Sequence, residues 1–125
     1  MNVVDSSAWL EYFANGPNAA FFASAIEQVD ELVVPSLTIY EVFKRVIQQR
    51  SETEALQAVA AMERGRVVDL DARLAVEAAR LSLETRLPMA DSIVLATARA
   101  SGATLWTEDA DFEGLPRVQF RGKKA

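Results

Sequence analysis

Short apolar runs alternate with longer amphipathic stretches along the whole chain. Each run is bounded by polar or turn-forming residues, as is typical of buried strands. The runs predict strands at residues 2–5, 32–34, 66–69 and 103–106, with a short last strand at residues 117–120.

Between these runs, apolar positions recur at helical spacing. After residue 36 the apolar stripe consists of Ile39, Val42, Phe43, Val46 and Ile47. Glu41 lies off this stripe, on another side of the same helix. Further helices are expected at residues 6–13, around residues 21–29, and at residues 51–64, 71–86 and 92–100. Ser6 or Ser7, Ser51 and Asp71 stand where N-cap residues are preferred.

Strands that alternate with helices indicate an α/β protein. We therefore expect a three-layer α/β/α fold around a small, mainly parallel central sheet. The length of 125 residues fits a single domain, residues 1–125, and the sequence contains no internal repeat, linker or low-complexity segment.

Two residue types are absent. The sequence has no cysteine, which excludes disulfides, thiol nucleophiles and Cys-based zinc sites. It also has no histidine, which excludes the Ser-His-Asp triad and histidine acid–base catalysis. An enzyme of this composition would have to use carboxylates, hydroxyls, Lys or Arg, and a metal would be a hard cation with oxygen ligands, such as Mg²⁺ or Mn²⁺.

The overall charge is acidic. A net charge of −5 argues superficially against a nucleic-acid partner, although acids gathered around a metal site are partly neutralised when the ion binds. Basic residues are grouped at 44–50 and 117–124, where a solvated face and an RNA contact fit equally well. No stretch qualifies as a membrane span or a signal peptide, so we expect no membrane association and a cytoplasmic location.

Acidic residues lie beside the ends of two predicted strands. Asp5 ends the first strand, and the loop with Asp109 and Asp111 follows the fourth. Because ligands bind at the carboxyl ends of parallel strands, both should open onto one edge of the sheet, with Glu41 within reach. Spacing alone places Asp91 near the opposite edge, unless its helix crosses obliquely or the break at residues 87–88 redirects the chain.

Each of these acids also has a structural explanation. Asp5 and Asp91 stand where Asp caps helices, Glu41 resembles an exposed helical Glu, and Asp109 and Asp111 are ordinary loop residues when taken singly. A cluster is different, because two carboxylates about 5 Å apart repel by roughly 3 kcal/mol at an effective dielectric of 20. Convergence of several acids would therefore indicate a cation site suited to phosphodiester hydrolysis.

Four segments together carry a family resemblance. They are Val3-Val4-Asp5-Ser6-Ser7-Ala8-Trp9-Leu10, Thr38-Ile39-Tyr40-Glu41-Val42, Ala90-Asp91-Ser92-Ile93-Val94-Leu95-Ala96-Thr97-Ala98 and Leu105-Trp106-Thr107-Glu108-Asp109-Ala110-Asp111-Phe112. In this order and spacing the chain resembles the PIN-domain family, and more narrowly the VapC toxins of bacterial toxin–antitoxin pairs.

The resemblance implies roles for individual residues. It implies that Asp5, Glu41, Asp91 and Asp109 form one acidic, metal-binding and catalytic quartet, which also brings Asp91 to the same pocket as the others. Further positions match supporting roles: Asp111 as a fifth acid, and Thr107 and Ser6 as hydroxyls. Glu108 adds a negative charge where the family varies.

The resemblance also implies cofactors and partners. The expected cofactor is Mg²⁺ or Mn²⁺, and the expected activity is that of a divalent-metal-dependent endoribonuclease that hydrolyses RNA phosphodiester bonds. The chain would be the toxin of a type II toxin–antitoxin pair and a homodimer. A VapB-type antitoxin would lie over the active-site groove and aim a basic side chain at the acids.

Three alternatives remain. An aspartyl-phosphate phosphatase would need a second Asp two residues after Asp5, where this chain has Ser7. A receiver-type signalling domain would have an acidic pair near the first strand and a Lys after the last, and this chain has neither. The third is a catalytically silent PIN-like module that acts only by binding its partner.

Overall fold

The central sheet has five strands that are all parallel. The computed structural model describes residues 1–124. The strands are β1 (Asn2–Val4), β2 (Leu32–Pro35), β3 (Arg66–Val68), β4 (Thr104–Thr107) and β5 (Val118–Phe120), in the order β3-β2-β1-β4-β5. The predicted strands are confirmed at each place, and so is the expected α/β class with a parallel sheet.

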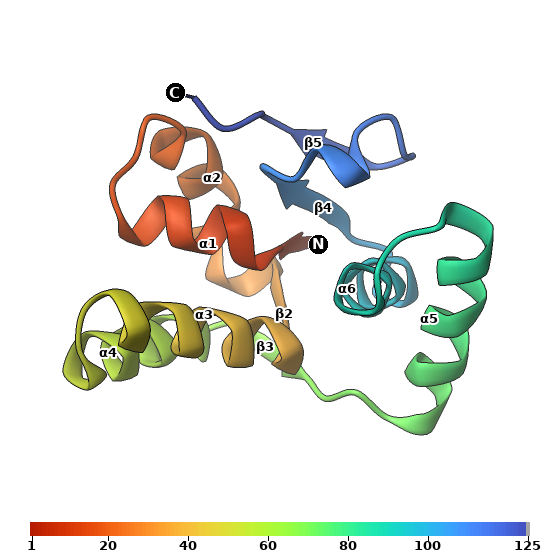
Figure 1. The fold of residues 1–125 in the computed structure, drawn as a ribbon, viewed down its shortest axis with the longest axis horizontal. Helices are drawn as coiled ribbons and strands as arrows, with labels where there is room; N and C mark the ends of the chain where they lie inside the picture. Colours follow the sequence, from red (N-terminus) through yellow and green to blue (C-terminus); the bar gives the residue numbers. More distant parts are fainter. Residues whose placement is uncertain (125) are drawn as a thin grey trace.

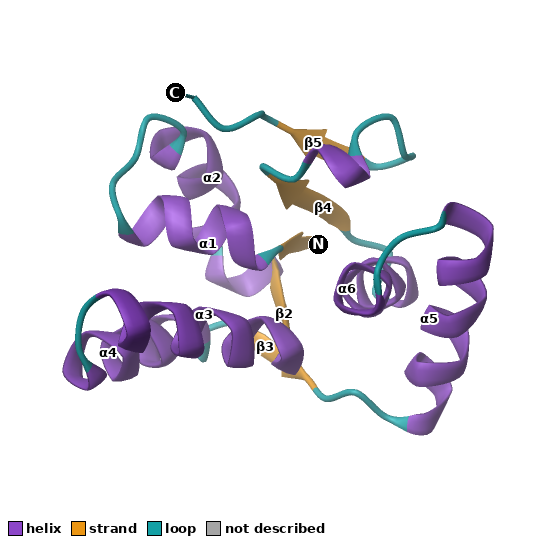
Figure 2. Cartoon of the chain, in the orientation of Figure 1, coloured by secondary structure: helices purple, strands orange, loops and turns teal. Residues whose placement is uncertain are grey.

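Helices cover both faces of this sheet. They are α1 (Ser6–Phe13), α2 (Ala19–Ile26), α3 (Ser36–Gln49), α4 (Glu52–Met62), α5 (Ala72–Thr85) and α6 (Met89–Ala100), with short 3₁₀ helices η1 (Val29–Glu31) and η2 (Ala110–Phe112). Figure 1 shows α1 to α4 on one side of the strands and α5 and α6 on the other. The same view coloured by secondary structure separates the two helical layers from the strands between them (Figure 2).

Neighbouring residues of the central strands face opposite layers. Val3 and Val33 pack in the cluster formed with α5 and α6, whereas Val4 and Val34 pack in the cluster formed with α1 to α4. All four side chains are fully buried. Since successive strand residues point to opposite faces, continuous apolar runs are needed where both faces are covered.

Some helix details differ from expectation. Of the caps expected for α1, Asp5 is confirmed, and Ser6 and Ser7 lie inside the helix. Asp91 was also expected as a cap, which is wrong, because it lies in the first turn of α6 after the N-cap Pro88. Helix α6 begins at Met89, earlier than expected, directly after Pro88, whose φ of −60° suits the residue before a helix. On α3, Ile47 is 38% exposed, while Thr38 is buried and donates its hydroxyl hydrogen bond to the Pro35 carbonyl (2.7 Å). The predicted caps Ser51 and Asp71 are confirmed.

None of the helices within residues 1–124 is both long enough and apolar enough to cross a membrane.

Candidate metal centre

The ends of β1 and β4 bring two distant segments together. The two strands are parallel neighbours, and the Asp5 N–H donates to the Trp106 carbonyl (3.1 Å). Asp5 follows β1 directly, and Thr107 is the last residue of β4. The loop that carries Asp109 therefore leaves the sheet beside Asp5, as parallel neighbours require.

Asp5 is held rigidly in this position. Its Oδ1 accepts hydrogen bonds from the Ser7 hydroxyl (2.6 Å) and the Ala8 N–H (3.2 Å), and its Oδ2 accepts one from the Thr107 hydroxyl (2.7 Å). The residue is only 5% exposed. A carboxylate can accept about four hydrogen bonds or metal bonds, so these contacts leave capacity for a cation.

The same hydroxyls also position the loop after β4. Ser7 Oγ accepts from the Glu108 N–H (3.1 Å), and Thr107 Oγ1 accepts from the Asp109 N–H (2.8 Å). Asp109 then caps η2 by accepting from the Asp111 N–H (2.9 Å). Two hydroxyl groups thus join the carboxylate of Asp5 to the backbone that presents the later acids.

Asp91 lies at the same edge, in the first turn of α6. The end of α6 adjoins the start of β4, since the Ala103 N–H donates to the Ala98 carbonyl (2.8 Å) one residue before that strand. The helix runs antiparallel to the strands, and its first turn is at their carboxyl ends. The spacing-based expectation of the opposite edge was wrong, because a helix that leads into a parallel strand begins where the preceding strands end.

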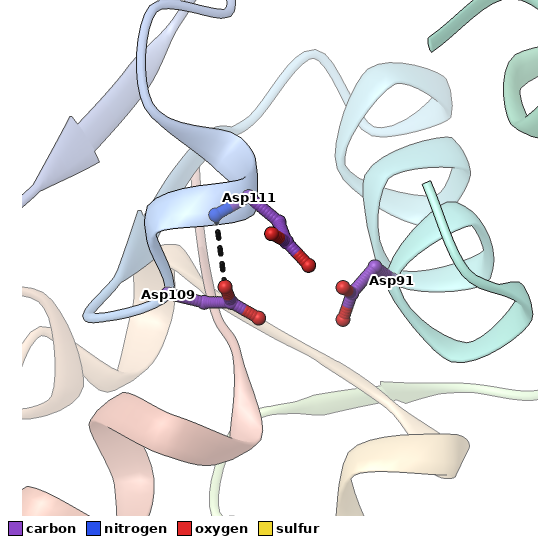
Figure 3. A group of neighbouring side chains, drawn as sticks. All are labelled: Asp91, Asp109 and Asp111. Carbon is purple, nitrogen blue, oxygen red and sulfur yellow. Dashed lines mark hydrogen bonds between the residues drawn. The ribbon is translucent and has the colours of Figure 1, made fainter. Parts of the chain in front are cut away.

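Three carboxylates form the tightest group. One oxygen from each of Asp91, Asp109 and Asp111 lies within 4.8 Å of the others. Figure 3 shows the three side chains pointing into one space between η2 and the first turn of α6. Within the described residues no other set of this kind occurs. The carboxylates of Asp5 and Glu41 therefore lie outside the tightest group. Asp111 belongs to it, although the sequence indicated only a supporting role.

The other four acids nevertheless all act on Asp91. The pKa of Asp91 is raised to about 7, first by burial and then by the negative charges of Asp109, Asp5, Asp111 and Glu41. The pKa of Asp5 is raised to about 6, chiefly by burial, although its three hydrogen bonds act in the opposite direction.

Glu41 stands on the second turn of α3 and is half-buried. Burial raises its pKa, and the nearby Ser6 side chain lowers it. Ser6 is thus placed beside Glu41, whereas Thr107 contacts Asp5.

The donor set suits a divalent cation. Every group that faces this space offers oxygen, and Mg²⁺ and Mn²⁺ prefer carboxylate oxygens. The raised pKa values of Asp5 and Asp91 show that the folded chain disfavours a fully ionised pocket. A bound cation would reverse that preference, so the residues present fit the group.

Sequence reasoning missed two features. Ser7 was expected only as a cap, yet its hydroxyl bridges Asp5 and the Glu108 backbone. The only signal in the sequence for this role was the position of Ser7, two residues after Asp5. Glu108 does not join the tight group of three, and its Oε2 accepts from the Asn18 side-chain amide (2.9 Å).

Comparison with solved structures shows the same fold in toxin–antitoxin proteins. A toxin–antitoxin complex from Klebsiella pneumoniae matches with a TM-score of 0.81 at 22% identity, covering 95% of this chain and 96% of that chain. VapC20 from Mycobacterium tuberculosis, described as a Sarcin-Ricin loop cleaving toxin, matches with a TM-score of 0.78 at 17% identity, covering 94% of this chain and 97% of that chain. DNA-bound VapBC from Salmonella typhimurium matches with a TM-score of 0.73 at 15% identity, covering 97% and 96% of the two chains.

A direct comparison with curated protein sequences gave no match. At the identities found, the likeness to solved structures shows a shared fold. The model of the PIN domain family, in contrast, matches residues 3–118 of the sequence itself. That range includes all five acids described above. The chain belongs to the PIN domain family.

Proposed function

We propose that this chain is the toxin of a type II toxin–antitoxin pair, a divalent-metal-dependent endoribonuclease whose residues 1–125 act as a single domain. The observation that carries this proposal is the convergence of Asp91, Asp109 and Asp111 within 4.8 Å of one another at the carboxyl edge of the sheet. Family membership supports a nuclease over the phosphatase and signalling alternatives.

Each acid has a distinct task in this proposal. Asp5, Asp91 and Asp109 would hold one or two Mg²⁺ or Mn²⁺ ions, and the exposed Asp111 would support the same ions. When bound, such an ion stabilises charge on phosphate oxygens and lowers the pKa of water. Glu41 is a ligand or orients the water that attacks the phosphate in line. Thr107 and Ser7 fix the direction of Asp5, and Ser6 does the same for Glu41.

The proposed partners follow from the family and its fold. Several proteins of this fold are described as toxin–antitoxin complexes, which supports a VapB-type antitoxin for this chain. An antitoxin Arg paired bidentately with the acids would take the place of the cation. We also propose a homodimer that acts on RNA in the cytoplasm.

The decisive test compares cleavage with and without available metal. Purified chain is incubated with a labelled single-stranded RNA in Mn²⁺ or Mg²⁺, and in parallel with excess EDTA. We expect internal cleavage with metal and loss of cleavage in EDTA, restored by added Mn²⁺. Equal cleavage in EDTA would overturn the metal-dependent mechanism. Intact RNA under every condition, together with firm antitoxin binding, would favour the silent partner-binding module.

A further inference from the structure

A second pocket opens directly beside the acidic cluster. It has a volume of about 440 Å³ and shares Asp109 with the cluster as part of its wall. This volume lies within the range of small-ligand sites and is large enough for one nucleotide. The pocket therefore borders the acidic cluster, where the scissile phosphate would lie in the proposed function.

Two cationic side chains line this pocket from different parts of the chain. Arg45 comes from α3, and Lys123 comes from the segment after β5. Both are exposed, and among residues 1–124 neither takes part in an ion pair. The charge of Lys123 lowers the pKa of Glu108 in the same wall, but neither cation is held in a direct ion pair, so both can approach an anion that enters from solvent.

The fold fixes the position of Lys123. The Arg121 N–H donates to the Thr107 carbonyl (3.0 Å), and the Arg121 guanidinium lies over the Phe21 ring, 4.1 Å from its centroid. The Gly122 carbonyl accepts from the side-chain amide of Asn18 (3.0 Å), which is only 1% exposed. Three contacts thus hold the residues just before Lys123 against the body of the protein.

Two acids besides Asp109 also line the pocket, and both are held by Asn18. Glu11 is buried, and its Oε2 accepts from the Asn18 N–H (2.7 Å). Glu108 accepts from the Asn18 side-chain amide (2.9 Å). Donor groups on a nucleotide base can approach these carboxylates, while a phosphate is drawn towards the two cations.

The remaining wall suits a base. Leu10 and Ala14 give an apolar surface, and Gln49 adds an amide that can both donate and accept hydrogen bonds. Base-paired RNA could not place one base in a pocket of this size, whereas an unpaired nucleotide could.

We propose that this side pocket binds the unpaired nucleotide next to the scissile phosphate, with Arg45 and Lys123 holding its own phosphate. This inference rests on the proposed ribonuclease function and specifies how the substrate is held. It assigns Arg45 and Lys123 to substrate binding and not to the chemical step.

The test uses paired variants of equal charge. Arg45→Gln/Lys123→Gln removes both pocket cations, and Lys44→Gln/Lys124→Gln removes their chain neighbours, which do not line the pocket. We expect the first pair to raise KM for single-stranded RNA about tenfold with kcat within about twofold, since the contacts bind substrate and transition state alike. The second pair should change KM by less than about threefold, because exposed charges outside the pocket act only at long range.

A binding measurement separates this proposal from the nuclease proposal. RNA anisotropy titrations on an Asp91→Asn background in Mg²⁺ give the salt dependence without cleavage. Loss of the one phosphate that both cations hold should reduce the slope of log K against log salt by about 0.7 in the pocket pair only. If the wild type cleaves RNA but both pairs behave alike, the pocket assignment is wrong and the nuclease stands. If the wild type binds RNA through this pocket without cleaving it, the pocket stands and the nuclease falls. If it neither binds nor cleaves RNA, both fall.

Discussion

Asp5 and Asp71 follow strands of the same sheet and cap the helices that come next, yet their surroundings differ. Asp5 accepts from the Ala8 N–H at 3.2 Å, and Asp71 accepts from the Leu74 N–H at 2.9 Å. Asp71 is exposed, whereas Asp5 is buried and also accepts two hydroxyl hydrogen bonds. Capping accounts fully for Asp71, but it does not explain why the fold buries Asp5.

The electrostatics of Asp5 point to the same conclusion. Burial raises the pKa of Asp5 from 3.8 to about 6, and Asp109 adds to the effect. Compared with the unfolded chain, the folded state without a cation therefore makes ionisation of Asp5 more costly. Groups perturbed in this way are typical of functional sites, where stability is given up for chemistry. One local motif thus serves structure at Asp71 and, in the proposed function, also metal binding at Asp5.

The largest expected effect separates the two ends by activity. Asp5→Asn and Asp91→Asn should each lower kcat for RNA cleavage by roughly a thousandfold or more, because each removes a proposed ligand of the ion. Asp71→Asn should leave kcat within about twofold. Steady-state cleavage assays on folded variants, checked by circular dichroism, measure this.

Wild-type activity in either cluster variant would show that the residue is not part of the catalytic site. A loss of activity in Asp71→Asn equal to that in Asp5→Asn would instead mean that the assay reports folding, and the comparison would carry no functional meaning.

A smaller effect is expected in the pH dependence of stability in EDTA. The pKa of Asp91 is about 7 in the folded chain against 3.8 ordinarily, so the folded state binds more protons between these values. The contribution of Asp91 to the free energy of unfolding should therefore be fully present below about pH 4. It should be lost as the pH rises to about 7 and then stay constant. Asp5 adds to the fall up to about pH 6.

Asp91→Asn removes the largest part of this dependence. At pH 8 in EDTA it should be more stable than the wild type by on the order of 2 kcal/mol, after allowance for solvent screening. Thermal melts across pH 4–8 on the wild type and on Asp91→Asn measure the effect. A wild-type Tm that rises from pH 5 to pH 8 in EDTA would contradict the raised pKa values.

The smallest expected effect lies at the structural end. Asp71→Ala should lower the free energy of unfolding by about 1 kcal/mol, because it removes a helix cap from the start of α5. Cleavage of RNA should be unchanged. Urea denaturation measures the loss, and a change in metal affinity in this variant would show that the two strand ends are not independent.

The sequence predicted the parts of this site that depend on strand order. Asp5 and the loop with Asp109 each follow an apolar run, and parallel strands bring such ends to one edge. Asp91 could not be placed in this way, because the direction of its helix was misjudged from spacing, and only the family resemblance put it with the others.

Other features depend on tertiary contacts that no local pattern encodes. Asp5 and Asp71 look alike as caps in the sequence, and only the approach of Thr107 and Ser7 distinguishes them. The bridge from Ser7 to the Glu108 backbone joins residues about a hundred positions apart, so spacing could not reveal it. Likewise, the exposure of Ile47 depends on how α3 packs in the folded chain and could not be predicted from its apolar character.

Diffraction from a crystal soaked in Mn²⁺, recorded at the manganese absorption edge, tests the central claim most directly. We predict an anomalous peak in the space bounded by Asp5, Asp91, Asp109 and Asp111, within coordination distance of their carboxylate oxygens. The same soak of Asp91→Asn should lose most of this peak. The account would be contradicted if a wild-type crystal showed no peak among these carboxylates at a Mn²⁺ concentration at which the protein cleaves RNA in solution.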